Sequence, residues 1–157
     1  MTSGRRGCQR VGTRENVRCR ADGVVGSTND GPFANRLGQR ALEVGLTGQV
    51  NAETVGGRHV GILAGQMDFI RAANRAREGH SIIALQSTNR DRSRSRIVAH
   101  LADGVVTTPR AEADIVVTEH GIAELRGRTL AERARALIQV ADPTFRAELA
   151  RASERLV

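Results

Sequence analysis

The 157-residue chain carries a net charge of +7 and a hydrophobic fraction of 39%, with three Phe, no Tyr and no Trp. This composition excludes a disordered or collagen-like chain and predicts a core built from Val, Ile, Leu and Ala. No apolar run approaches the roughly 20 residues that span a bilayer, and no apolar segment of a secretory signal follows the basic N-terminus. We therefore expect a cytoplasmic protein with no membrane partner.

All 24 basic residues are Arg. A strongly basic domain usually indicates nucleic acid or another anionic ligand. Arg without Lys also reflects a compositional bias, however, and the aromatic side chains that stack on bases are scarce. We expect no nucleic-acid partner. Cys8 and Cys19 lack zinc or CxxC spacing and the four His residues are scattered, so no metal site is predicted.

The chain divides at about residue 40. Residues 1–40 are rich in Gly, Arg, Ser and Asn, show almost no periodicity, and are predicted to be poorly ordered. Residues 41–157 are predicted to form one domain with short buried strands, because β-prone runs recur between polar or glycine-rich breaks. These runs are residues 42–46, 49–53, 81–85, 96–101, 105–108 and 114–118.

Three helices are predicted among these strands. The first follows Gly65, ends near Gly79, and places its apolar residues on one face, namely Phe69, Ala72, Ala73 and Ala76. The second begins at a capping box formed by Thr129 and Glu132, and the third at Asp142 followed by proline. Strands interleaved with helices predict an α/β layered domain, with a mixed, largely parallel sheet flanked by helices.

Glu119 is the first candidate site residue. It directly follows the buried run at residues 114–118, and ligands of open α/β sheets bind beyond the carboxyl ends of the strands. Gly121 allows a sharp turn there. Glu119 is either a carboxylate that handles a ligand or a solvated residue in a turn, and the residues alone leave both interpretations open.

Two further places have weaker signals. Gly65 leads into a helix, where free backbone N–H groups suit an oxyanion or a phosphate, although a plain loop-to-helix junction is the commoner explanation. The loop from residue 89 to residue 96 carries four Arg and could bind a phosphate or RNA, but a solvated surface loop explains such a run more often.

Seven segments, in this order, resemble the C-terminal domain of the acetyl-CoA hydrolase/transferase family, which includes acetate, succinate and 4-hydroxybutyrate CoA-transferases. They are LEVGLTGQVNAETVGG, AGQMDF, SIIALQST, SRIV, VTTPRAEADIVVTEHGIAELRG, TLAERARALI and DPTFRAEL. The resemblance covers about residue 41 to the end. It implies a NagB/RpiA/CoA-transferase-like fold and transfer of CoA between an acyl-CoA and a small carboxylic acid such as acetate, or hydrolysis when water is the acceptor.

The resemblance also assigns roles to residues. Glu119 matches an active-site carboxylate that is distinct from the nucleophile, and Gly65 matches the second glycine of a loop beside the thioester, whose N–H stabilises the oxyanion. Asn29 is aligned with an asparagine of the oxyanion hole. Coenzyme A is implied as a substrate, with no other cofactor. The expected partners are a separate N-terminal CoA-transferase domain or a second copy of the chain.

Some residues depart from the family pattern. The nucleophilic glutamate of the family lies upstream, and nothing in residues 1–40 matches it, Glu15 included. His120 replaces a usual tyrosine, and Ala64 replaces the first loop glycine. We therefore expect a truncated gene product. Three functions remain open: an active transferase or hydrolase domain, an inactive remnant that binds CoA or pairs with an N-terminal subunit, and an Arg-rich RNA-binding protein.

Overall fold

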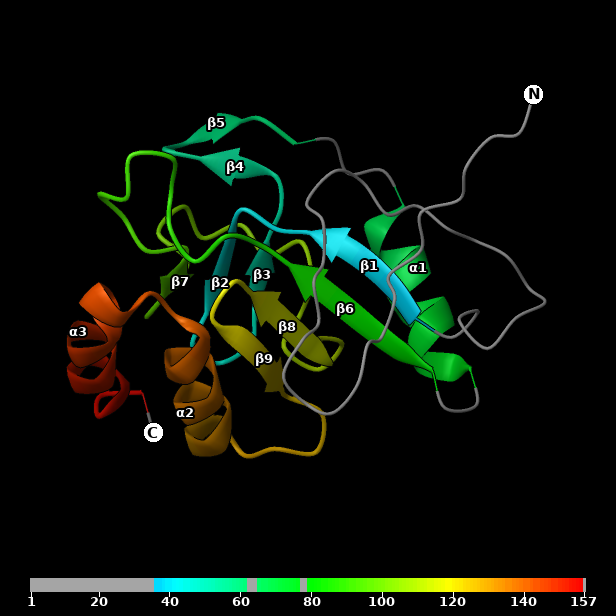
Figure 1. Ribbon diagram of the computed structural model, residues 1–157. Helices are drawn as coiled ribbons and strands as arrows, with labels where there is room; N and C mark the ends of the chain where they lie inside the picture. The colour runs from blue at the N-terminus through cyan, green and yellow to red at the C-terminus, as the bar shows by residue number, and fades with distance from the viewer. Residues whose placement is uncertain (1–35, 62–64, 77–78, 157) are drawn as a thin grey trace, which may run out of the picture.

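A computed structural model describes residues 36–61, 65–76 and 79–156 of the chain (Figure 1). Its elements follow in chain order as β1 (Arg36–Arg40), β2 (Glu43–Gly45), β3 (Val50–Asn51), β4 (Thr54–Val55), β5 (Arg58–His59), α1 (Gln66–Arg75), β6 (His80–Ala84), β7 (Ile97–Val98), β8 (Ile115–Thr118), β9 (Gly121–Glu124), α2 (Leu130–Val140) and α3 (Pro143–Ser153). None of the helices in these ranges is long and apolar enough to cross a lipid bilayer.

The main sheet has four strands in the order β1-β6-β8-β9. The first three are parallel and β9 is antiparallel to β8, so the carboxyl ends of β1, β6 and β8 lie at one edge (Figure 1). A smaller sheet has the order β3-β2-β7, and β4 and β5 form a separate hairpin. The expected α/β domain with a mixed, largely parallel sheet is confirmed.

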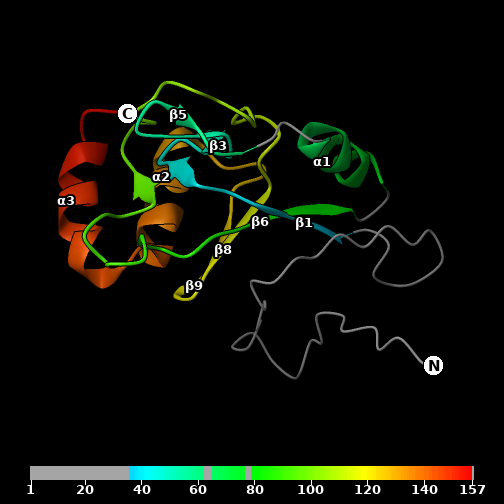
Figure 2. The ribbon, with the colours of Figure 1, turned by 90° about the horizontal axis from the view of Figure 1, so that it is seen from above.

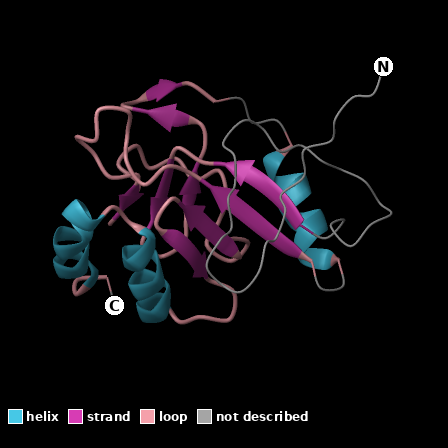
Figure 3. Cartoon of the chain, in the orientation of Figure 1, coloured by secondary structure: helices cyan, strands magenta, loops and turns pink. Residues whose placement is uncertain are grey.

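The helices pack on different parts of the main sheet. α1 packs against β1 and β6, whereas α2 packs against β9 and β8 and also against α3. Figure 3 shows the strands between these two groups of helices, and the view from above places α1 and the α2–α3 pair at opposite ends of the molecule (Figure 2). The helix starts follow local signals: Thr129 and Glu132 form the expected capping box, and the Asp142 side chain accepts a hydrogen bond from the Thr144 N–H.

The core consists almost entirely of aliphatic side chains, as the composition predicts. Its largest fully buried members come from every layer: Leu46, Ile70, Ile83, Ile97, Leu125 and Leu137. Removing one of these from water contributes about 1.5–3 kcal/mol to the folded state. Because this core joins α2 to both the main sheet and the smaller sheet, it fixes the strand ends that carry the candidate site.

Two expectations about local structure were wrong. Residues 36–40 form β1, paired in parallel with β6, although the sequence predicts no ordered element before residue 41. On α1 the buried residues are Gln66, Ile70 and Ala73, so the apolar face expected around Phe69 and Ala72 is rotated. Ala72 and Ala73 are small and neighbouring, so they fix the buried side less firmly than Ile70 does. The polar Gln66 is accommodated on that side because it donates to the Thr108 hydroxyl at 3.2 Å.

The strands around residue 100 are also shorter than the sequence predicts. Only Ile97 and Val98 pair as β7, and residues 105–108 form no regular strand, although Thr108 bridges Val50. The run at residues 55–61 contains β5 and the two glycines of a hairpin turn. These short pieces are held by many single backbone hydrogen bonds rather than by a continuous ladder.

Candidate functional site

The β8–β9 hairpin positions Glu119 and His120. Thr118 pairs with Gly121, so Glu119 and His120 form a two-residue turn at the carboxyl end of β8. The Thr118 hydroxyl donates to the Val140 carbonyl at 2.6 Å and accepts from the His120 N–H at 3.1 Å. The turn is therefore tied to the end of α2, and the Glu119 side chain starts from a fixed backbone.

Glu119 is bound by Ser87, which follows the neighbouring parallel strand β6. The Ser87 N–H donates to Oε2 of Glu119 at 2.9 Å, and the Ser87 hydroxyl donates to Oε1 at 2.6 Å. Ser87 is fully buried, whereas the Glu119 side chain remains 48% exposed. Glu119 thus lies in a turn and is a positioned, half-exposed carboxylate, and its role toward a ligand stays a prediction.

The environment of Glu119 favours its ionised form. Partial burial raises the pKa of this carboxyl group. The hydrogen bonds from Ser87 and from the backbone, together with the nearby His120, lower the pKa by more than burial raises it. The net result is a pKa below the ordinary value of 4.5. At neutral pH the site therefore presents a carboxylate that accepts hydrogen bonds and cannot donate one.

His120 and Asp142 extend the site toward α3. His120 Nε2 lies 3.8 Å from Oε1 of Glu119 and 3.7 Å from Oδ2 of Asp142. The pKa of Asp142 is lowered, chiefly by hydrogen bonds from Thr144 and to a smaller extent by the charges of His120 and Arg92. The sequence indicates Asp142 only as a helix cap, and its place beside His120 follows from the packing of α2 and α3, which no local pattern encodes.

Gly65 lies at the same edge of the main sheet, where it is positioned by α1 and not by the β8–β9 hairpin. α1 leads back into β6 through residue 79 and runs antiparallel to it, so the start of the helix lies at the carboxyl ends of the parallel strands (Figure 1). Gly65 has a φ of 68°, a left-handed conformation that favours glycine. Within the described residues, no hydrogen bond joins Gly65 to Glu119, and its role at an oxyanion stays a prediction. Asn29 lies outside the described residues.

A second charged cluster lies at the opposite edge of the sheet. Asp114, which is 3% exposed, contacts His80 Nδ1 at 2.8 Å and Arg126 at 3.0 Å. Arg126 also donates to the Gly79 carbonyl and to the Asn74 side chain. These bonds tie the end of α1 to the start of β6 and the end of β9, so this cluster is structural.

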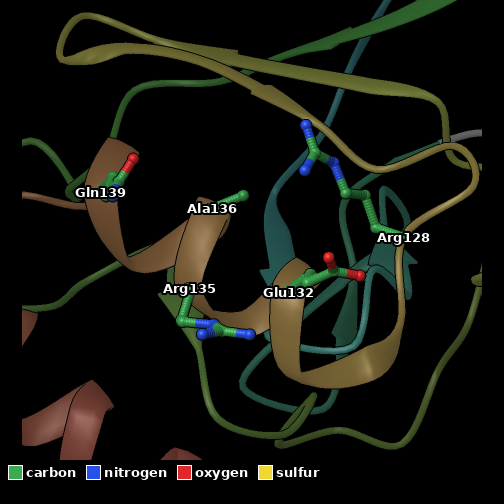
Figure 4. Close-up of a pocket in the computed structure, with 5 residues that line it drawn as sticks. All are labelled: Arg128, Glu132, Arg135, Ala136 and Gln139. Atoms are coloured by element: carbon green, nitrogen blue, oxygen red, sulfur yellow. The ribbon is translucent and has the colours of Figure 1, made fainter.

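A polar, open depression of about 350 Å³ runs along one side of α2 and is lined by Arg128, Glu132, Arg135, Ala136 and Gln139 (Figure 4). The Glu132 carboxylate is already committed to the helix cap. In the part of the chain that the structure describes, no group of three His, Cys, Asp or Glu side chains is placed to hold a metal ion.

Residues 37–153 match the model of the acetyl-CoA hydrolase/transferase C-terminal domain. The chain is 49% identical over 109 residues to a 4-hydroxybutyrate coenzyme A transferase of Clostridium kluyveri, covering 69% of this chain and 25% of that protein. It is 43% identical over 118 residues to a probable butyrate:acetyl-CoA coenzyme A-transferase of Syntrophomonas wolfei, covering 73% of this chain and 26% of that protein. The chain thus spans about a quarter of the length of these relatives.

Solved structures agree with the fold. RipA from Yersinia pestis superimposes with a TM-score of 0.71 at 39% identity, covering 77% of this chain and 27% of RipA. A 4-hydroxybutyrate CoA-transferase from Porphyromonas gingivalis superimposes with a TM-score of 0.61 at 38% identity, covering 78% of this chain and 27% of that one.

Proposed function

Because the chain belongs to the acetyl-CoA hydrolase/transferase family, whose C-terminal domain it matches over residues 37–153, we propose that it handles the acyl-CoA in transfer of CoA to a small carboxylic acid. The single observation that carries this proposal is the ionised, half-exposed Glu119 carboxylate, held by buried Ser87 at the carboxyl edge of the parallel strands. Ligands of such sheets bind at this edge.

In the proposed reaction, Glu119 orients the reacting groups and is not the nucleophile. A nucleophilic glutamate, which the family resemblance places upstream of this region, attacks the acyl carbon and the C–S bond breaks to release CoA thiolate. The thiolate then attacks the carbonyl of that glutamate, and the acyl group leaves as its free carboxylate. An acceptor acid takes up CoA by the reverse sequence. Coenzyme A is a substrate, and no other cofactor takes part.

Gly65 is proposed to stabilise the oxyanion through its backbone N–H. Its position at the start of α1 adds the positive end of the helix dipole to that N–H, which favours a developing negative charge. Acetate is the proposed acceptor, by analogy with the printed names of the butyrate:acetyl-CoA and butyryl-CoA:acetate transferases among the relatives. Water as the acceptor would give hydrolysis instead.

A second candidate function is CoA binding without turnover, with the nucleophile supplied by a separate N-terminal chain or lost. It is favoured by the described residues themselves, because the family resemblance assigns none of them the role of the nucleophile. Thiol release separates the two functions. The purified chain is incubated with acetyl-CoA or succinyl-CoA, with and without acetate, beside a Glu119→Ala variant.

Thiol release by wild type above the level of the Glu119→Ala variant supports a complete active site within this chain. CoA binding without release supports the second candidate. If the chain neither binds CoA nor releases thiol, the proposed function is wrong. Salt-sensitive binding to unrelated RNA in place of CoA would support the RNA-binding alternative.

A further inference from the structure

The loop from residue 89 to residue 96, here called the arginine loop, is a strongly charged surface that the proposed function does not use. Four arginines and one aspartate give it a net charge of +3. We propose that Arg90 and Arg92 of the arginine loop bind the phosphate groups of the CoA moiety while its thioester end lies at Glu119. This inference rests on the proposed function and names the part of the substrate that the loop recognises.

The arginine loop is held in one shape before any ligand binds. The Asn89 N–H donates to the Arg94 carbonyl and the Arg94 N–H donates to the Asn89 side chain, both at 3.0 Å. The Asp91 carboxylate accepts from the Ser93 hydroxyl at 2.8 Å. A preformed loop loses little conformational entropy on binding, so more of its contact energy appears as affinity.

Arg92 has an unusual backbone. Its φ of 59° makes it the only residue other than glycine with a left-handed conformation in the part of the chain that the structure describes. Side chains other than Gly, Asn and Asp adopt this conformation at a cost of about 1 kcal/mol. Strained residues of this kind persist only where the surrounding structure enforces their conformation, and they cluster at functional sites.

The charges of the loop divide into two groups. Burial and Asp103 raise the pKa of Glu43, and the charges of Arg94 and Arg96 oppose that rise. These two arginines therefore lie near the half-buried carboxylate of Glu43. Arg90, Arg92 and Arg94 are exposed, and within the described residues none of the four loop arginines has a carboxylate at ion-pair distance. Arg90 and Arg92 are the two exposed arginines whose charges do not act on Glu43. They are therefore the members of the loop that we assign to an external anion.

The arginine loop is continuous with the Glu119 site on two sides. Ser87, which binds the Glu119 carboxylate, lies two residues before the loop. On the other side, the charge of Arg92 contributes to the lowered pKa of Asp142, whose Oδ2 lies 3.7 Å from His120 Nε2. His120 Nε2 in turn lies 3.8 Å from Oε1 of Glu119. Arg92 is thus linked to Glu119 through Asp142 and His120, and Arg90 lies two residues before it in the same loop.

CoA fits this arrangement chemically. Its diphosphate and 3′-phosphate are joined to the thiol by a long flexible arm, so the phosphates bind away from the reacting thioester. Arginine forks match phosphate oxygens in paired, charge-assisted hydrogen bonds. Repulsion from Glu119, Asp91 and Asp142 keeps phosphates off the carboxylates themselves, which leaves the thioester end of the ligand at Glu119.

The test measures binding by calorimetry in three versions of the full chain: wild type, Arg90→Gln/Arg92→Gln and the control Arg75→Gln/Arg151→Gln. The control removes the same charge from exposed positions on α1 and α3. The ligands are CoA and pantetheine, which has the thiol arm without phosphates. We expect the loop variant to bind CoA at least about tenfold more weakly, the control to bind CoA like wild type, and all three to bind pantetheine equally.

Equal CoA affinity in wild type and the loop variant overturns the inference and leaves the proposed function standing. Equal weakening in the loop variant and the control also overturns it, because only net charge would then matter. Displacement of CoA by unrelated single-stranded RNA at similar concentration would identify a general polyanion surface, and contradicts the inference too. Absence of any CoA or pantetheine binding to wild type contradicts the proposed function itself. Thermal unfolding of each variant confirms that it is folded.

Discussion

Ser87 and Glu119 lie 32 residues apart in the chain and are joined by three hydrogen-bond contacts, of which the hydroxyl contact is 2.6 Å long. The contact exists because β6 and β8 are parallel neighbours and both end at the same edge. The contact fixes the direction of a carboxylate that lies in a turn, and it favours the ionised form of that carboxylate.

Ser87→Ala removes the hydroxyl but keeps the backbone donor. We expect a loss of about 1–2 kcal/mol in the free energy of unfolding, since one charge-assisted hydrogen bond disappears. We also expect the pKa of Glu119 to rise toward its ordinary value, because its largest lowering contribution is the Ser87 side chain. Carboxyl NMR titration of both proteins measures this rise, and an unchanged Glu119 pKa would contradict the assigned contact.

The Glu119 contribution to stability depends on pH with a definite sign. Its pKa is lower in the folded chain than the ordinary 4.5, so the stabilisation is fully present above about pH 4.5 and is lost as the pH falls through the folded value. We expect wild type to unfold at a higher temperature than Glu119→Gln at pH 7, with the difference shrinking below pH 4.5. The effect is modest because the side chain is half exposed. A difference in unfolding temperature that grows at low pH would contradict a lowered pKa of Glu119.

Glu119→Ala should leave the fold intact. The side chain lies outside the aliphatic core, so its removal costs the Ser87 hydrogen bonds and little packing. We expect the loss in the free energy of unfolding to stay at about 1–2 kcal/mol. A collapse of the cooperative thermal transition would show that Glu119 is chiefly structural.

Asp114→Asn tests the structural cluster at the other edge. It removes a buried charge from between His80 and Arg126, so we expect a loss of roughly 3 kcal/mol or more in chemical denaturation. Glu124→Gln is the matched control, because Glu124 is an exposed carboxylate on adjacent β9. Equal stability of the two variants would mean that the Asp114 contacts contribute little.

Gly65→Ala tests the left-handed start of α1. An added Cβ would meet only the Phe69 ring, at 3.6 Å, so the expected cost of about 1–2 kcal/mol comes from the φ of 68° and not from crowding. Gly45→Ala is the control, since the nearest atom to its Cβ lies at 3.7 Å and its backbone is not left-handed. Unfolding midpoints should fall for the first variant and stay nearly constant for the second.

Local signals in the sequence predict local structure well. The capping box at Thr129 and the cap at Asp142 are both confirmed, because each depends on residues within one turn of helix. β1 could not be predicted in this way. Its sequence RLGQR has one apolar residue, and the strand forms because the edge of β6 supplies hydrogen-bond partners from 44 residues further along the chain.

The candidate site divides similarly. The position of Glu119 is predictable because a buried run ends just before it, and the structure places it directly after β8. The sequence does not reveal Ser87 or Asp142 as its surroundings, since parallel strands and helix packing bring them there from distant segments. Asn29 lies outside the described residues, and the catalytic roles of Glu119 and Gly65 stay predictions.

An acyl-CoA site at Glu119 is tested most directly by NMR mapping of the ¹⁵N-labelled chain titrated with acetyl-CoA. We predict that the largest shifts of backbone amides occur at Ser87 and Glu119, which are hydrogen-bonded beyond the carboxyl ends of β6 and β8, and at Gly65 at the start of α1. We also predict that the depression along α2 is unaffected. Shifts confined to that depression or to the Asp114 cluster, or no shifts at all, would contradict the assignment of Glu119 to an acyl-CoA site.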